Sequence, residues 1–313
     1  MMDIKRLFAW AIIALPLFAA CDEGDKITNE EGGDNGTSVE VSMKALIGEW
    51  FINTFDESED VNNTLTFKSD GTYVEETVYY SKYDGKTEIS SQYRTEGTFK
   101  LDGSILIGTV TKSQCRYANW VNGVNKGLTE WEDNEWYSSF DSLQVSLLRD
   151  GALLLLEANG TGSETQQHEG YASFFFRKGA KLPNDKSELQ GTWYWYSYGM
   201  IRDDAADVRV AVKIDGDNID MVITPWGARY TGKYTYKDGI VTIGKTTFYT
   251  SRDKTGYGDV MNYEKPFETK WRTPEPDDYY QNGYPDGFSF PFVVSGNTAY
   301  SMFVGLAPVY KKQ

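Results

Sequence analysis

Leu46-Ile47-Gly48-Glu49-Trp50 recurs further along the chain as Leu189-Gln190-Gly191-Thr192-Trp193. An Asp-Gly dipeptide follows each copy, with its glycine 23 residues after Gly48 and 25 residues after Gly191. Each copy then closes with an apolar stretch and a basic residue, Phe174-Phe175-Phe176-Arg177 in the first and Val309-Tyr310-Lys311 in the second. Several matched landmarks in the same order indicate an internal duplication.

The segments between these landmarks have the alternation that is typical of β-strands. In residues 207–214 every second residue is apolar, which predicts one strand face formed by Val208, Val210, Val212 and Ile214. The Asp-Gly dipeptides between such runs predict tight hairpin turns. No long segment has helical periodicity. The chain is therefore predicted to be all-β, with strands joined by hairpins into antiparallel barrels or sandwiches.

These landmarks resemble the lipocalin-like domains of bacterial lipoproteins. The resemblance covers residues 43–180 and 187–313, and it implies two tandem antiparallel β-barrels of the up-and-down type, closed or open and flattened. In lipocalins an arginine from near the last strand packs over the motif tryptophan; Arg177 fits this pattern, and the second copy has Lys311 in its place. The residues implied to hold the barrels together are Gly48, Trp50 and Arg177 in the first domain and Gly191, Trp193 and Lys311 in the second.

Residues 1–20 have the features of a secretory signal peptide. Lys5 and Arg6 precede a run of 14 apolar residues, which is shorter than the roughly 20 residues needed to span a bilayer. The segment Leu17-Phe18-Ala19-Ala20-Cys21 resembles the lipobox of bacterial lipoproteins, in which the cysteine is lipidated and becomes the mature N-terminus. The resemblance implies that the protein is attached to a membrane through lipid on Cys21.

Residues 21–42 are acidic and offer little to bury, so they are predicted to form a disordered tether. The acidic cluster directly after Cys21 resembles the surface-export signal of lipoproteins in the Bacteroidetes. It implies a protein of the cell envelope that is anchored to the outer membrane and exposed on the cell surface. The alternative is an anchored protein that faces the periplasm.

The composition argues against several classes of function. The 313 residues include 31 Lys and Arg against 46 Asp and Glu, and the net charge of -15 argues against binding of nucleic acid. One histidine and two cysteines are too few for the usual ligands of a zinc site. The sequence contains no nucleophile elbow, phosphate-binding loop or dinucleotide fingerprint. We therefore expect a protein that is not an enzyme and needs no metal or cofactor.

Two segments rich in aromatic residues are predicted to be insertions, at 113–140 and 251–291. Irregular segments of this length are usually binding loops or lids. Aromatic rings beside amides and carboxylates could stack on sugar rings while their neighbours bind the hydroxyl groups. Alternatively, the insertions plug a barrel mouth or hold the two domains together. The candidate ligand-binding residues are Trp120, Trp131, Trp136, Tyr137, Trp271, Tyr279, Tyr280 and Tyr284.

Three hypotheses about function follow. The first is a non-catalytic module that binds a small hydrophobic molecule, a lipid or a glycan. The second is a structural or assembly lipoprotein that contacts a partner protein of the envelope through its aromatic loops. The third is a carboxylate-based hydrolase, which needs two facing carboxylates. The barrel interiors distinguish the first two, because an eight-stranded barrel can be filled by side chains or hold one ligand.

Overall fold

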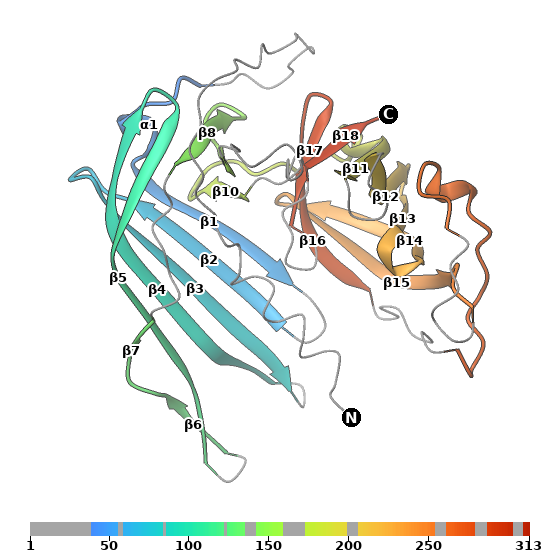
Figure 1. Ribbon diagram of the computed structural model, residues 1–313, viewed down its shortest axis with the longest axis horizontal. Coiled ribbons are helices and arrows are strands. Elements are labelled where there is room, and N and C mark those ends of the chain that lie inside the picture. Colours follow the sequence, from blue (N-terminus) through green and yellow to red (C-terminus); the bar gives the residue numbers. More distant parts are fainter. Residues whose placement is uncertain are drawn as a thin grey trace. The chain divides into compact units, whose positions relative to one another are not determined.

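The computed structural model describes residues 39–55, 59–83, 86–121, 124–134, 142–158, 173–198, 206–253, 261–278, 287–302 and 309–313. These residues form two compact units that meet in the sequence between Leu182 and Pro183. Strands predominate in both units (Figure 1), and the strand ladders within each unit are antiparallel. The prediction of an all-β chain with tandem antiparallel barrel domains is confirmed.

The first unit opens with one helical turn and continues as a long antiparallel sheet. Consecutive strands pair from β1 to β6 and from β8 to β10, and β5 also pairs with β7 and β8. β10 returns to β1 through Trp50 and Phe51. Its elements are α1 (Met43–Leu46), β1 (Gly48–Phe55), β2 (Glu59–Phe67), β3 (Thr72–Tyr83), β4 (Lys86–Asp102), β5 (Ile105–Val121), β6 (Val124–Leu128), β7 (Glu132–Asp133), β8 (Leu143–Leu148), β9 (Leu153–Ala158) and β10 (Ser173–Arg177).

The second unit is a closed barrel of eight strands. Its strands pair in sequence order, and the last strand, β18, pairs back with the first, β11. Its elements are η2 (Lys186–Leu189), β11 (Gly191–Tyr198), β12 (Ala206–Asp215), β13 (Asn218–Ile223), η3 (Thr224–Trp226), β14 (Ala228–Lys237), β15 (Ile240–Thr250), η4 (Pro266–Glu268), β16 (Phe288–Ser295), β17 (Thr298–Ser301) and β18 (Val309–Lys312).

The predicted face of β12 is correct for three of its four residues. Val210, Val212 and Ile214 belong to the main core of the second barrel, whereas Val208 packs in a separate cluster with Ala211. Trp195 of β11 pairs with Val210, and the next residue, Tyr196, pairs with Val208. A β-bulge therefore adds one residue between the two valines. The prediction for Val208 is wrong because such a bulge changes the alternation of side chains.

The first predicted insertion, 113–140, is regular over much of its length. Residues 113–121 continue β5; they pair with β4 as far as Tyr117 and then with residues 124–128, which form β6. In Figure 1 the hairpin of β5 and β6 lies at the far end of β5 from β8. The prediction of an irregular segment is wrong here because backbone pairing continues into a part of the hairpin whose polar side chains carry no clear alternation. Residues 135–140 lie outside the described part of the chain.

The second predicted insertion, 251–291, is described at 251–253, 261–278 and 287–291. Met261, Phe267 and Trp271 pack against the cluster that contains Val208 of β12. The backbone N–H of Val208 also donates a hydrogen bond to the carbonyl oxygen of Tyr263 (3.1 Å). This part of the insertion therefore covers residues of its own barrel. The final residues, from Phe288 onward, belong to strand β16 and not to an insertion.

Candidate functional site

A cation lies over a buried tryptophan at one end of the first unit. Trp50 is fully buried, and its Nε1 donates a hydrogen bond to the backbone oxygen of Leu46 (2.8 Å). The guanidinium carbon of Arg177 lies 4.2 Å from the centre of the Trp50 ring. Arg177 also donates hydrogen bonds to the carbonyl oxygens of Gly151, Ile47 and Ala45. Arg177 thus joins the last strand to the first.

The second barrel repeats this arrangement with a lysine. Trp193 is fully buried, and its Nε1 donates a hydrogen bond to the backbone oxygen of Leu189 (2.8 Å). The Nζ atom of Lys312 lies 5.1 Å from the centre of the Trp193 ring. The prediction of Lys311 for this place is off by one residue, because Trp193 pairs with Lys312 while Lys311 pairs with Tyr194. The Lys311 side chain instead donates a hydrogen bond to Oγ1 of Thr298 (3.3 Å).

The motif glycines leave room for these cations. Gly48 and Gly191 have φ angles of +134° and +126°, which L side chains rarely adopt. A Cβ atom at Gly191 would lie 2.9 Å from Cε of Lys312. A Cβ atom at Gly48 would lie 3.4 Å from Nη1 of Arg177. The repeated sequence motif therefore has a structural role: its glycines leave room for the cations that pack on its tryptophans.

Bulky side chains fill the interior of the second barrel. The Trp193 ring contacts Phe292 edge-on, and Phe292 in turn lies against Phe290 and Tyr310. The hydroxyl group of Tyr236 donates a hydrogen bond to the backbone oxygen of Phe292 (3.0 Å). The large members of this core are Trp193, Trp195, Met221, Tyr230, Tyr234, Tyr236, Phe288, Phe290, Phe292 and Tyr310. Large side chains therefore pack against one another through the interior of the second barrel.

The long strands of the first unit have a different inner face. Tyr73, Thr77 and Tyr79 of β3 are buried, so the side chain of Glu75 points to the same side of the sheet. Glu75 pairs across the strands with Leu65 of β2 and Thr95 of β4. We call the polar residues on this side the polar inner face, which consists of Asn63, Glu75, Thr77, Thr95 and Ser113.

Glu75 and Asn63 form the centre of the polar inner face. Nδ2 of Asn63 donates a hydrogen bond to Oε1 of Glu75 (3.0 Å), the one hydrogen bond to this carboxyl group among the described residues. Oδ1 of Asn63 is buried and has no hydrogen-bond partner in the described part of the chain. Buried polar atoms are normally hydrogen-bonded. The pair therefore has unused capacity to bind hydrogen-bond donors.

The environment of Glu75 disfavours its charged form. Burial raises the pKa of the Glu75 carboxyl, and the hydrogen bond from Asn63 opposes this shift. Glu75 and Asn63 nevertheless keep part of their surface accessible, whereas their neighbours Thr77 and Thr95 are buried. Protein therefore surrounds the carboxyl group, although the Glu75 residue as a whole is only partly buried.

Tyrosines flank this carboxyl group along the strands. Tyr73 precedes Glu75 on the same face, and its ring lies against Gly97, where an added Cβ atom would be 2.5 Å from Cε1 of Tyr73. On the other side, Tyr93 is two residues from Thr95, the partner of Glu75. The ring of Tyr93 contacts those of Tyr79 (5.7 Å between centres) and Tyr117 (6.1 Å). Aromatic surface therefore lies on both sides of Glu75 along the strands.

The described candidate residues from the predicted insertions have different environments. The side chain of Trp120 is 55% exposed near the end of β5. The ring of Trp131 lies under the guanidinium group of Arg116, at 4.4 Å. Trp271 is partly buried, and its Nε1 donates a hydrogen bond to the backbone oxygen of Pro266 (3.2 Å). The remaining candidates lie outside the described residues: Trp136, Tyr137, Tyr279, Tyr280 and Tyr284.

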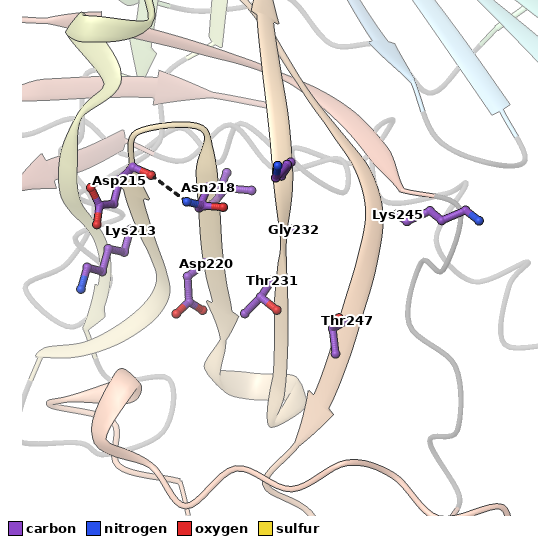
Figure 2. Close-up of a pocket in the computed structure, with 10 residues that line it drawn as sticks. Lys213, Asp215, Asn218, Asp220, Thr231, Gly232, Lys245 and Thr247 are labelled. Carbon is purple, nitrogen blue, oxygen red and sulfur yellow. Dashed lines mark hydrogen bonds between the residues drawn. The ribbon is translucent and has the colours of Figure 1, made fainter.

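An open hollow of about 530 Å³ lies on the second barrel, over β12 to β15. Figure 2 shows Asp220, Thr231 and Thr247 in a row across three neighbouring strands, in agreement with their pairing. Arg229 holds the Asp220 carboxylate with two hydrogen bonds (2.9 and 2.6 Å). The amine ends of Lys213 and Lys245 point away from each other in Figure 2. These two lysines therefore do not converge on one point of the hollow.

The hairpin that begins at Asp215 joins β12 to β13. Asp215 pairs with Asn218 across the turn, and the Asp217 carboxylate accepts a hydrogen bond from Nζ of Lys186 (2.7 Å). Among the described residues, no group of three or more His, Cys, Asp or Glu side chains could hold a metal ion. In the same part of the chain, no helix is long and apolar enough to cross a bilayer.

Comparison of the sequence with known protein families and with characterised proteins finds no match to either. The candidate site is therefore assigned from the geometry of its residues alone. The polar inner face was not predicted, because the aromatic residues of the two predicted insertions gave the stronger signal in the sequence. One signal was available: in Tyr73-Val74-Glu75-Glu76-Thr77-Val78-Tyr79 a glutamate occupies the same alternating register as the residues that become buried.

Proposed function

We propose that this protein is a lipid-anchored protein of the outer membrane that binds a small ligand on the polar inner face of its first unit. The observation that carries the proposal is the pair of Glu75 and Asn63, two partly buried residues whose hydrogen bond leaves Oδ1 of Asn63 buried without a partner among the described residues. Ligand sites usually combine apolar and aromatic walls with a few polar groups that orient the ligand. The tyrosines beside Glu75 supply such walls.

The interior of the second barrel supports the assignment of ligand binding to the first unit. Its interior is occupied by its own aromatic side chains, so binding inside it would require them to move. The first unit instead places a carboxyl, an amide and three hydroxyl groups on the inner face of its longest strands. In this proposal the first unit binds the ligand and the second is a rigid companion domain.

A thermal-shift screen of glycans and small lipids with the full-length protein tests the binding function. A ligand should raise the melting temperature of the wild type and lose most of that effect in Asn63→Leu. The matched control is Asn62→Leu, one residue away on the opposite face of β2, which should retain the effect. A ligand whose effect survives Asn63→Leu but is lost in Trp271→Ala would place binding on the second unit and contradict the proposal.

The membrane anchor has a separate test. Cys21 provides the thiol that lipidation requires, and the residues before it resemble a lipobox. Cys21→Ser should move the protein from the membrane fraction to the soluble fraction of the envelope. Digestion of intact cells with a protease distinguishes surface exposure from a periplasmic location. Retention of Cys21→Ser in membranes would contradict lipid anchoring.

The tip of the β5–β6 hairpin favours a second candidate function, contact with a partner protein. Trp120, Val121 and Val124 are 55%, 46% and 52% exposed. Exposed apolar side chains that gather in one place often mark interaction sites. A photoreactive residue at position 120 should then form a cross-linked species of defined mass in cells. The same residue at the exposed Lys100 position on β4 serves as the control and should not form it.

A further inference from the structure

Among the described residues, Glu75 has no positively charged partner. Arg94 of the neighbouring strand β4 binds Glu76 and Glu96 instead. Glu76 follows Glu75 directly, so its side chain lies on the opposite face of β3. The enclosed carboxyl group is therefore protonated or paired with a cation that the described residues do not supply.

The surroundings of Glu75 suit one kind of cation. Oδ1 of Asn63 is a second acceptor beside the carboxyl group and has no donor among the described residues. Diagonal neighbours on paired strands lie about 7–8 Å apart, within reach of aromatic side chains, and Tyr93 has this relation to Glu75. Aromatic rings attract organic cations through their negative faces. A group with several N–H donors and an organic body fits all three features.

We propose that the ligand of the first unit is a small organic molecule with a protonated amine, whose ammonium group binds Glu75 and Asn63 while its body lies against Tyr93. This inference rests on the proposed binding function and specifies the chemical class of the ligand. The ammonium group donates to the Glu75 carboxylate and to Oδ1 of Asn63. A charged pair in an enclosed site is stronger than one in water, so this contact provides both affinity and selection for amines.

Titration calorimetry of the full-length protein tests the proposal with two matched pairs of probes. The first pair is phenethylamine and 2-phenylethanol, and the second is glucosamine and glucose. Each pair keeps the body of the molecule and exchanges an amine for a hydroxyl group. At least one amine should bind the wild type at least tenfold more tightly than its neutral counterpart.

Two variants and one control locate the contact. Glu75→Gln should weaken binding of the amine at least tenfold and leave the neutral probe unchanged. Asn63→Ala should weaken binding of the amine about threefold or more. The control is Glu76→Gln, which removes a carboxylate from the neighbouring residue on the outer face and should leave both affinities unchanged. Circular dichroism and melting temperature verify that each variant is folded.

Two results would overturn the amine assignment in different ways. Neutral probes that bind as tightly as amines, with affinity retained in Glu75→Gln and lost in Tyr93→Ala, would keep the binding function and exclude a required cation. Failure of all four probes to bind at millimolar concentration, together with no hit in the glycan and lipid screen, would overturn both the amine assignment and the binding function.

Discussion

The Nζ atom of Lys312 lies 5.1 Å from the centre of the Trp193 indole ring. Trp50 and Arg177 have the same relation in the first unit, and both pairs consist of residues directly opposite each other in the ladder between the first and last strands. The duplicated motif therefore encodes a way of closing each unit. The two copies differ in strength, because an arginine can also donate several directed hydrogen bonds whereas a lysine presents a compact charge.

Arg177→Met should destabilise the protein by about 2–4 kcal/mol, since it removes a cation from the Trp50 ring and leaves backbone carbonyl groups without their donor. The midpoint of urea unfolding, followed by tryptophan fluorescence, measures the change. Lys178→Met is the control, because the exposed pair of Lys178 and Glu49 contributes at most about 1 kcal/mol. Equal effects of the two substitutions would contradict this account.

Lys312→Met should destabilise the second barrel by about 0.5–1 kcal/mol, the usual contribution of an exposed cation–aromatic pair. Lys311→Met should change stability by less than about 0.5 kcal/mol, because Lys311 is exposed and not stacked on the motif tryptophan. Denaturant unfolding of both variants provides the comparison. A larger loss of stability for Lys311→Met than for Lys312→Met would favour Lys311, the residue predicted from the sequence, as the partner of Trp193.

Glu75→Gln should raise the melting temperature at neutral pH. Burial raises the pKa of this carboxyl, so the native state holds the proton to a higher pH than the unfolded chain does. Stability of the wild type therefore falls as pH rises from the ordinary glutamate range through the folded pKa. The facing groups Asn63, Thr77, Thr95 and Ser113 are uncharged. Burial also raises the pKa of Tyr73, which remains neutral in this range.

The measurement for Glu75 is the difference in melting temperature between Glu75→Gln and wild type, recorded from pH 4 to pH 8. The difference should be smallest at the acidic end and should grow with pH. Glu76→Gln on the outer face serves as the comparison and should show no such growth. A wild type that gains stability over Glu75→Gln as pH rises would mean that the carboxylate is stabilised in the native state.

Gly97→Ala should destabilise the first unit by about 1–3 kcal/mol, as is usual for overpacking. The added Cβ atom would lie 2.3 Å from the carbonyl oxygen of Thr109 and 2.5 Å from Cε1 of Tyr73. Gly103→Ala is the matched control, since nothing lies within 4 Å of an added Cβ atom there and only its φ of +58° opposes the substitution. A cost of about 1 kcal/mol is expected for that control. Thermal unfolding distinguishes the two.

Local signals in the sequence predicted the framework of the fold correctly. The Asp-Gly dipeptides form hairpin turns, with φ angles of +80° at Gly71 and +58° at Gly216. A turn of this kind is decided by the few residues that form it, so it can be read without knowledge of the rest of the chain. The repeated tryptophan motif likewise predicted two similar antiparallel units.

Details that depend on register were predicted less well. The bulge on β12 moves Val208 to another cluster, and the pairing of β18 brings Lys312 in place of Lys311 to Trp193. A shift of one residue exchanges the two faces of a strand, so a small local irregularity reverses a prediction from alternation. The bulge leaves no mark in the residues of β12, whereas β18 is regular and places Lys312 on the same face as the buried Tyr310.

By itself, the sequence determined the strand class, the turns and the duplication, because each follows from short runs of residues and their period along the chain. Only the tertiary structure decided which side chains meet. Glu75, Asn63 and Tyr93 come from three strands, and they share one inner face because β2, β3 and β4 pair in a particular register. That register is a property of the whole sheet, so the candidate site became visible only when the strands were assembled.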